Sequence, residues 1–105
     1  MSPNSVNVYI SCRNLIDLDL GISKSDPFAV MFLKSEHESI WQCLGRTETM
    51  WNNLNPDFLK FFKVNYYFEK NQFIRLEIYE QDDNDDHELI GFYECALNKI
   101  LTANK

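Results

Sequence analysis

Two short segments hold more than half of the acidic residues of this 105-residue chain. Residues 17–26 and 80–88 together carry nine acids and one lysine, a local net charge of −8, whereas the rest carries nine bases and seven acids. The acids are Asp17, Asp19, Asp26, Glu80, Asp82, Asp83, Asp85, Asp86 and Glu88. Carboxylate oxygens are the ligands that calcium prefers. The segments are therefore either a calcium site, if folding brings them together, or two solvated acidic loops.

The second segment does not fit the EF-hand, a common calcium-binding loop. Counted from Asp82, loop positions 3 and 5 are Asn84 and Asp86, which suit calcium. Position 6, however, is His87 where the loop needs glycine, and position 12 is Tyr93 where it needs glutamate. The flanking residues also show strand rather than helix patterns. We therefore exclude an EF-hand.

Apolar and polar residues alternate around the acidic segments, as they do in half-buried strands. In residues 73–79, for example, Ile74, Leu76 and Ile78 share one face. Together with the apolar run at 28–33 after Pro27 and the turn-forming residues 52–56, such patterns predict strands at 6–11, 28–33, 41–49, 58–64, 73–79 and 90–96, and a short helical turn over 97–101. This order predicts an all-β antiparallel sandwich. Each acidic segment follows a strand, so the two can meet at one end of the sandwich.

Composition excludes several classes of function. A net charge of −6 argues against a nucleic-acid partner. No window approaches the ~18 apolar residues of a membrane-spanning helix, and no signal peptide is visible, so we expect a cytoplasmic protein. Three widely spaced cysteines, Cys12, Cys43 and Cys95, fit reduced thiols there. With three glycines and no Gly-x-Ser-x-Gly elbow, we expect no enzyme.

Several short motifs, in this order and spacing, resemble a C2 domain. They are Asn14-Leu-Ile-Asp-Leu-Asp19, Ser25-Asp-Pro-Phe28, Leu54-Asn-Pro56, Glu80-Gln-Asp82 and Glu88-Leu-Ile-Gly91. Further segments resemble the first C2 domain of copines, which are calcium-dependent phospholipid-binding proteins. These are Gly45-Arg-Thr-Glu48 and Val64-Asn-Tyr-Tyr-Phe-Glu69, with Gln72 shortly after.

The resemblance implies a C2-type Greek-key sandwich of two four-stranded antiparallel sheets, with calcium held between loops at one end. Residues 1–105 would form a single C2 domain, C-terminally truncated and lacking one or two closing strands. The implied ligands of two calcium ions are Asp19, Asp26, Glu80, Asp82 and Glu88, with the carbonyls of Leu18 and Gln81. Glu80 and Glu88 stand where C2 domains usually have Asp, and Asp86 is an alternative to Glu88.

The implied function is calcium-dependent binding to anionic phospholipid, with the protein moving from the cytoplasm to plasma or internal membranes when calcium rises. Leu20, Ile22 and Trp51 are candidate lipid contacts, although Trp51 also suits packing at a strand end. Lys60 and Lys63 are a candidate basic patch for phosphoinositides or, alternatively, lie on a solvated strand face. A calcium-independent C2-like module that binds protein partners remains the alternative function.

Overall fold

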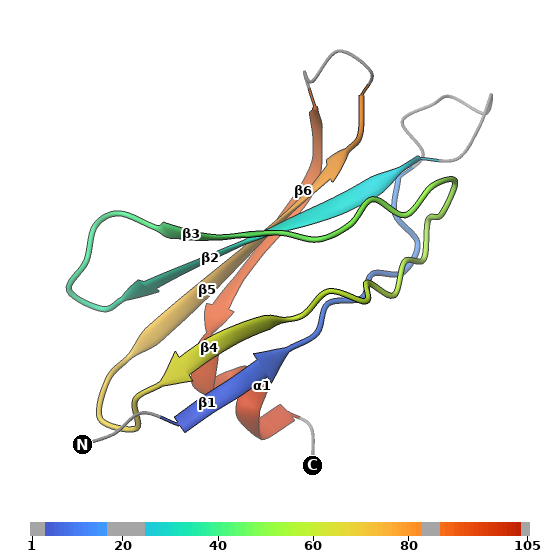
Figure 1. Ribbon diagram of the computed structural model, residues 1–105. Helices are drawn as coiled ribbons and strands as arrows, with labels where there is room; N and C mark the ends of the chain where they lie inside the picture. The colour runs from blue at the N-terminus through green and yellow to red at the C-terminus, as the bar shows by residue number, and fades with distance from the viewer. Residues whose placement is uncertain (1–3, 17–24, 83–86, 104–105) are drawn as a thin grey trace.

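The structure, a computed structural model, describes residues 4–16, 25–82 and 87–103, which form two β-sheets and one helix. The elements are β1 (Asn4–Val8), β2 (Pro27–Ser35), β3 (Gln42–Arg46), β4 (Phe62–Tyr66), β5 (Gln72–Glu80), β6 (Glu88–Ala96) and α1 (Leu97–Ala103). A four-stranded sheet has the order β3-β2-β5-β6, and β1 pairs with β4 in a second sheet; all pairs are antiparallel. Figure 1 shows these sheets as two layers. No helix in the described part is long and apolar enough to cross a membrane.

The predicted all-β sandwich is confirmed, and each predicted strand and the helical turn has a counterpart. The bounds differ most at β1 and β4, which begin at Asn4 and Phe62. Beyond the ends of β1 and β4, an isolated bridge joins Ser11 to Asp57 in place of a regular ladder, so the two strands are shorter than the sequence pattern predicts. The smaller sheet has two strands among the described residues, where the resemblance implies four.

The hydrophobic core lies between the two sheets. Alternate residues of each strand point inward, so the smaller sheet contributes Val8 from β1 and Phe62 and Val64 from β4. The larger sheet contributes, among others, Met31 and Ile74, which are both fully buried. Burial of apolar surface, at roughly 25 cal/mol per Å², is the main force that holds the layers together.

The pairing of β2 with β5 positions the acidic segments. These strands form nine consecutive pairs, from Pro27 opposite Glu80 to Ser35 opposite Gln72. The first residue of β2 therefore lies beside the last residue of β5. Glu80 in turn pairs with Glu88, the first residue of β6. The ladder thus brings residues from both acidic segments to one end of the larger sheet.

The outer face of this sheet carries an ion network. Arg75 pairs with Glu77, at 2.7 Å from Nε to Oε2, and with Glu94. The Tyr79 hydroxyl also donates to Glu77, at 2.6 Å. Burial raises the pKa of Glu77, but the hydrogen bonds from Tyr79 and Arg75 outweigh this effect, so its pKa lies below the usual value. The ionised form of Glu77 therefore stabilises the fold.

We predict that Glu77→Gln lowers the free energy of unfolding by about 1 to 2 kcal/mol at pH 7, since hydrogen bonds to a charged group are lost. A lowered pKa in the folded state stabilises above the unfolded pKa, about 4.3, and this contribution is lost as pH falls through the folded value. The difference between wild type and variant should therefore be smaller at about pH 3 than at pH 7. Urea unfolding at both pH values measures it, and an unchanged difference at low pH would contradict this role.

Candidate metal centre

Asp26 connects three segments at the acidic end of the sandwich. Its backbone N–H donates to the Glu80 carboxylate, at 3.2 and 3.3 Å from the two oxygens. Its backbone C=O accepts a hydrogen bond from the Gln81 N–H at 2.9 Å. Its side-chain Oδ1 accepts one from the Asn52 N–H at 2.6 Å. These bonds fix the Asp26 carboxylate between the start of β2, the end of β5 and the turn at Asn52.

The turn that contains Asn52 is tied to the start of β2. Met50 N–H donates to the Pro27 C=O at 2.9 Å, and Asn53 N–H donates to the Ser25 C=O at 3.0 Å. Asn52 has a φ of 53°, in the left-handed region that asparagine tolerates better than most residues. Trp51 is therefore held at the same end as Asp26, and its side chain is 66% exposed.

Asp82 and His87, which lie in the loop between β5 and β6, are also joined. The Asp82 N–H donates to Nδ1 of His87 at 3.1 Å. The His87 ring packs edge-on against Phe28, with 5.0 Å between ring centroids. On the other side, the Gln81 Oε1 accepts a hydrogen bond from the Thr49 hydroxyl at 3.0 Å. The described part of this loop is thus anchored to both β2 and the segment after β3.

Four of the five candidate metal ligands lie at this end. They are Asp26, Glu80, Asp82 and Glu88. Glu80 is only 7% exposed, whereas Asp82 and Glu88 are exposed. Asp19 lies outside the described residues, as do Leu18, Leu20, Ile22 and Asp86. Within the described ranges, no three His, Cys, Asp or Glu side chains are grouped closely enough to hold a metal ion. The ligand set therefore stays a prediction.

The chemistry of the described donors fits calcium better than zinc. The acids at this end offer oxygen, which suits a hard cation, and Cys thiolates are absent from the described residues of this cluster. Glu80 already accepts a bond from the Asp26 N–H, but an ionised carboxylate has about four lone-pair sites. Both Asp26 and Glu80 can therefore keep their structural hydrogen bonds while offering further oxygen lone pairs.

An exposed apolar side chain that the sequence patterns did not reveal lies at this end. Ile16 is 65% exposed, and its C=O accepts a hydrogen bond from the Ser25 hydroxyl at 3.2 Å. It is thus a neighbour of the segment that leads into Asp26. Ile16 belongs to the motif Asn14-Leu-Ile-Asp-Leu-Asp19, but nothing in that motif marked it as an exposed side chain at this end, because its place depends on this tertiary contact.

The two candidate basic residues lie in β4 or just before it. Lys63 sits between the buried Phe62 and Val64 and therefore points away from the core. Lys60 precedes the strand, and its Nζ lies 5.6 Å from the centroid of the Phe62 ring, which belongs to the core. Both side chains are exposed, and the basic patch stays a prediction.

Comparisons with known proteins agree on one family. A family model described as "C2 domain" matches residues 5–105. "Nicotinic receptor-associated protein 1" of Caenorhabditis elegans is 36% identical over 119 residues, which cover 93% of this chain and 19% of that protein. "Copine-D" of Dictyostelium discoideum is 33% identical over 107 residues, which cover 95% of this chain and 20% of that protein. The chain thus spans about a fifth of the length of these curated relatives.

Solved structures show the same fold. The chain "BON1-C2B" superposes with a TM-score of 0.75 at 30% identity, over 95% of this chain and 69% of that one. A C2 domain of plant Extended Synaptotagmin 1 superposes with a TM-score of 0.74 at 23% identity, over 94% of this chain and 72% of that one. Both matches support the sandwich architecture described above.

The buried Glu80 carboxylate gives a test of how the end of the sandwich is held together. We predict that Glu80→Ala lowers the free energy of unfolding by about 1 to 3 kcal/mol in the presence of a chelator, because the Asp26 N–H loses its acceptor. Glu80→Gln keeps an acceptor oxygen, so its free energy of unfolding should fall by less than that of Glu80→Ala. Urea unfolding measures both variants.

Glu88→Ala is the matched control, since Glu88 is exposed and pairs with Glu80 across the strands. Its effect should stay within about 0.5 kcal/mol, as for most surface substitutions. Equal losses for Glu80→Ala and Glu88→Ala would contradict a structural role for the Glu80 carboxylate.

Proposed function

The chain belongs to the C2 domain family, and from this premise we propose that it binds anionic phospholipid membranes in a calcium-dependent manner. The observation that carries the proposal is the Asp26 hydrogen-bond network, which holds acids from both acidic segments at one end of the sandwich. Asp19, Asp26, Glu80, Asp82 and Glu88 would be the ligands, with two calcium ions as the expected number. This is a binding role, and we propose no catalysis.

The charge distribution supports membrane binding that calcium switches on. The two acidic segments carry a net charge of −8, while the rest of the chain carries +2. Without a cation, this end repels an anionic membrane. Calcium supplies positive charge there and coordination positions that lipid phosphate oxygens can occupy. Each charge near an anionic surface contributes about 1 kcal/mol to the binding free energy. Two calcium ions add about four charges, which is enough to turn repulsion from the membrane into attraction.

Two exposed apolar side chains support contact with the membrane at the same end. Trp51 and Ile16 are each about two-thirds exposed. The Ile16 C=O bonds to the Ser25 hydroxyl, and the chain neighbours of Trp51 are hydrogen-bonded to Asp26 and to the residues on either side of it. Tryptophan favours the membrane interface because its ring is apolar and its N–H stays hydrated. Leu20 and Ile22 would extend this contact. The proposed cellular consequence is movement from the cytoplasm to a membrane when calcium rises.

A second candidate function is calcium-independent binding of a protein partner. It is favoured by the hydrogen bond between Glu80 and Asp26, which holds this end together through the chain's own atoms. One relative is named for its association with a nicotinic receptor, although this chain matches only 19% of that protein. Under this alternative, the acidic loops serve as a protein contact and need no cation.

Co-sedimentation with phosphatidylserine vesicles separates the two candidates. We predict that the chain sediments with vesicles in calcium but not in chelator, and that Asp26→Asn combined with Asp82→Asn weakens binding by about tenfold or more. Asn at position 26 keeps a side-chain oxygen for the Asn52 N–H, so this pair of substitutions tests charge rather than folding.

The matched control also removes two negative charges, through Glu36→Gln and Glu38→Gln just beyond the opposite end of β2. This control should bind vesicles like the wild type. If neither calcium nor the Asp26 and Asp82 substitutions change sedimentation, the calcium-dependent proposal is wrong and protein partners become the function to pursue.

A further inference from the structure

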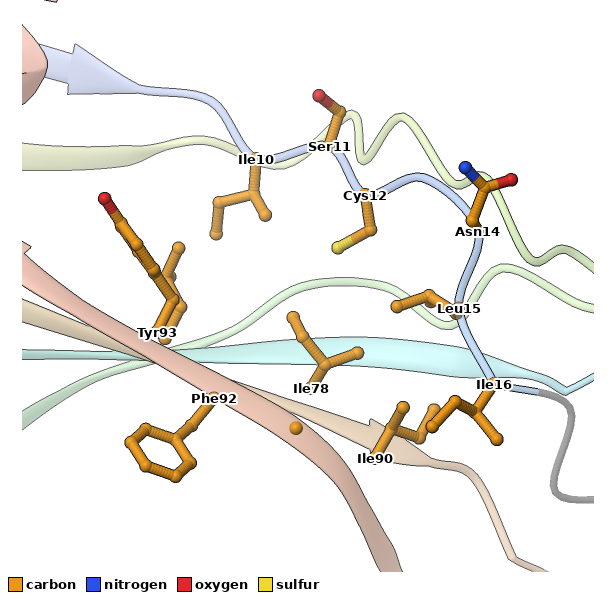
Figure 2. A pocket seen from close by; sticks show the side chains of 12 residues that line it. Ile10, Ser11, Cys12, Asn14, Leu15, Ile16, Ile78, Ile90, Phe92 and Tyr93 are labelled. Carbon is orange, nitrogen blue, oxygen red and sulfur yellow. The ribbon is translucent and has the colours of Figure 1, made fainter.

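The outer face of the larger sheet carries cations that stack on aromatic rings. Figure 2 shows the ring of Phe92 directed to this side, away from Ile10, and the Arg75 guanidinium lies 4.1 Å from its centroid. Near the acidic end, the Arg46 guanidinium lies 3.6 Å from the centroid of the Phe28 ring. Arg75 is paired with two glutamates, whereas Arg46 forms no salt bridge within the part of the chain that the structure describes. The contacts of Arg46 therefore need another explanation than charge pairing.

Arg46 donates its hydrogen bonds to uncharged oxygens that lead to the loop between β5 and β6. Its Nε donates to the Thr47 C=O at 3.1 Å, and one terminal nitrogen donates to the Thr49 hydroxyl at 2.8 Å. The same nitrogen donates to Oε1 of Gln81 at 3.4 Å. This oxygen also accepts a hydrogen bond from the Thr49 hydroxyl at 3.0 Å. Arg46, at the end of β3, thus holds the Gln81 side chain both directly and through Thr49.

Gln81 passes this restraint to the peptide group that joins it to Asp82. Its Nε2 donates to the Asp82 C=O at 3.3 Å, and its backbone N–H donates to the Asp26 C=O at 2.9 Å. The Asp82 N–H donates to Nδ1 of His87 at 3.1 Å. Because the C=O and N–H of one trans peptide group point in opposite directions, the Gln81 C=O is directed away from His87. The Gln81 carbonyl and the Asp82 carboxylate, both implied calcium ligands, therefore belong to a segment with a fixed backbone.

The other end of this loop meets the same arginine through Phe28. The His87 ring packs edge-on against Phe28, with 5.0 Å between centroids, and the Tyr79 ring stacks on it at 5.6 Å. Phe28 is only 4% exposed, so its ring is enclosed by these neighbours and by the Arg46 guanidinium. The two ends of the loop, at Gln81 and at His87, therefore share one anchor, which is the stacked pair of Arg46 and Phe28.

We propose that Arg46 is a positioning residue for the calcium site, because it orders the ligand groups of Gln81 and Asp82 before a cation binds. This inference rests on the proposed calcium-dependent function. A site that is ordered in advance loses less conformational entropy on binding and therefore binds more tightly. Coulomb's law alone predicts the reverse, since a positive charge beside the site opposes a second cation. The two effects have opposite signs, so substitution of Arg46 distinguishes them.

Calcium titration of the 105-residue chain and its variants by isothermal calorimetry provides the test. We expect Arg46→Met to weaken calcium binding by about threefold or more, a factor typical for the loss of one hydrogen bond, although it removes a repulsive charge. Arg46→Lys keeps the charge but lacks the planar fork of donors, so it should also weaken binding.

Lys34→Met is the matched control. It also removes a cation that stacks on an aromatic ring, since the Lys34 Nζ lies 5.1 Å from the centroid of Trp41. Lys34, however, lies near the end of β2 that is opposite to Asp26, where salt screens its charge from the acidic end. Its substitution should leave calcium affinity unchanged.

A second measurement does not depend on calcium. In chelator, hydrogen exchange of the Gln81 and Asp82 amides reports how firmly the loop is held. Thr49→Val removes the hydroxyl with little change in size, so exchange at these amides should become about threefold faster or more. Thr49→Ser keeps the hydroxyl and should exchange like the wild type. Arg46→Met should also speed exchange at these amides.

The two measurements separate this inference from the proposed function. If the wild type binds no calcium, the proposed function is wrong, and so is the calcium role of Arg46. If the wild type binds calcium but a folded Arg46→Met variant binds it equally or more tightly, only the positioning role is wrong. Unchanged amide exchange at Gln81 and Asp82 in both Arg46→Met and Thr49→Val would also overturn the positioning role.

Discussion

The antiparallel ladder between β2 and β5 is the constraint on which the rest of the structure depends. Its nine pairs place Pro27 opposite Glu80, so the residue before β2, Asp26, lies beside the end of β5. Only with this register can the Asp26 N–H reach the Glu80 carboxylate and the Gln81 N–H reach the Asp26 C=O. A slip by one residue would turn every side chain of one strand to the other face and expose Met31 or Ile74.

The site and the fold share the same atoms at this end. Glu80 is almost fully buried, and a buried carboxylate is costly unless it is hydrogen-bonded. The Asp26 N–H meets part of this need and holds the two strand ends together. Because the same carboxylates would also hold calcium, a variant there changes stability as well as metal affinity. Measurements of stability in chelator are therefore needed to separate the two roles.

Much of this arrangement could be predicted from the sequence, but the hydrogen bonds that hold the acidic end together could not. Alternation revealed the strands at 6–11 and 73–79 because burial on one face imposes a period of two, whereas an apolar run revealed the strand at 28–33. The order of acids around Asp26 and Glu80 pointed to one end of the sandwich. The roles of Asn52 and His87 were missed, since one acts through its backbone N–H and the other accepts from a backbone N–H. The bounds of β1 and β4 also differed from the predicted ones, because the two strands separate where the bridge between Ser11 and Asp57 replaces a regular ladder.

Direct calcium titration of the purified chain by isothermal calorimetry tests the central claim that the Asp26 network assembles a calcium site. The account predicts saturable heat of binding with a stoichiometry of about two, the ion number that the resemblance to C2 domains implies. It also predicts that calcium raises the melting temperature, since a ligand that binds only the folded state stabilises it. No binding heat and no change in melting temperature at millimolar calcium would contradict the account.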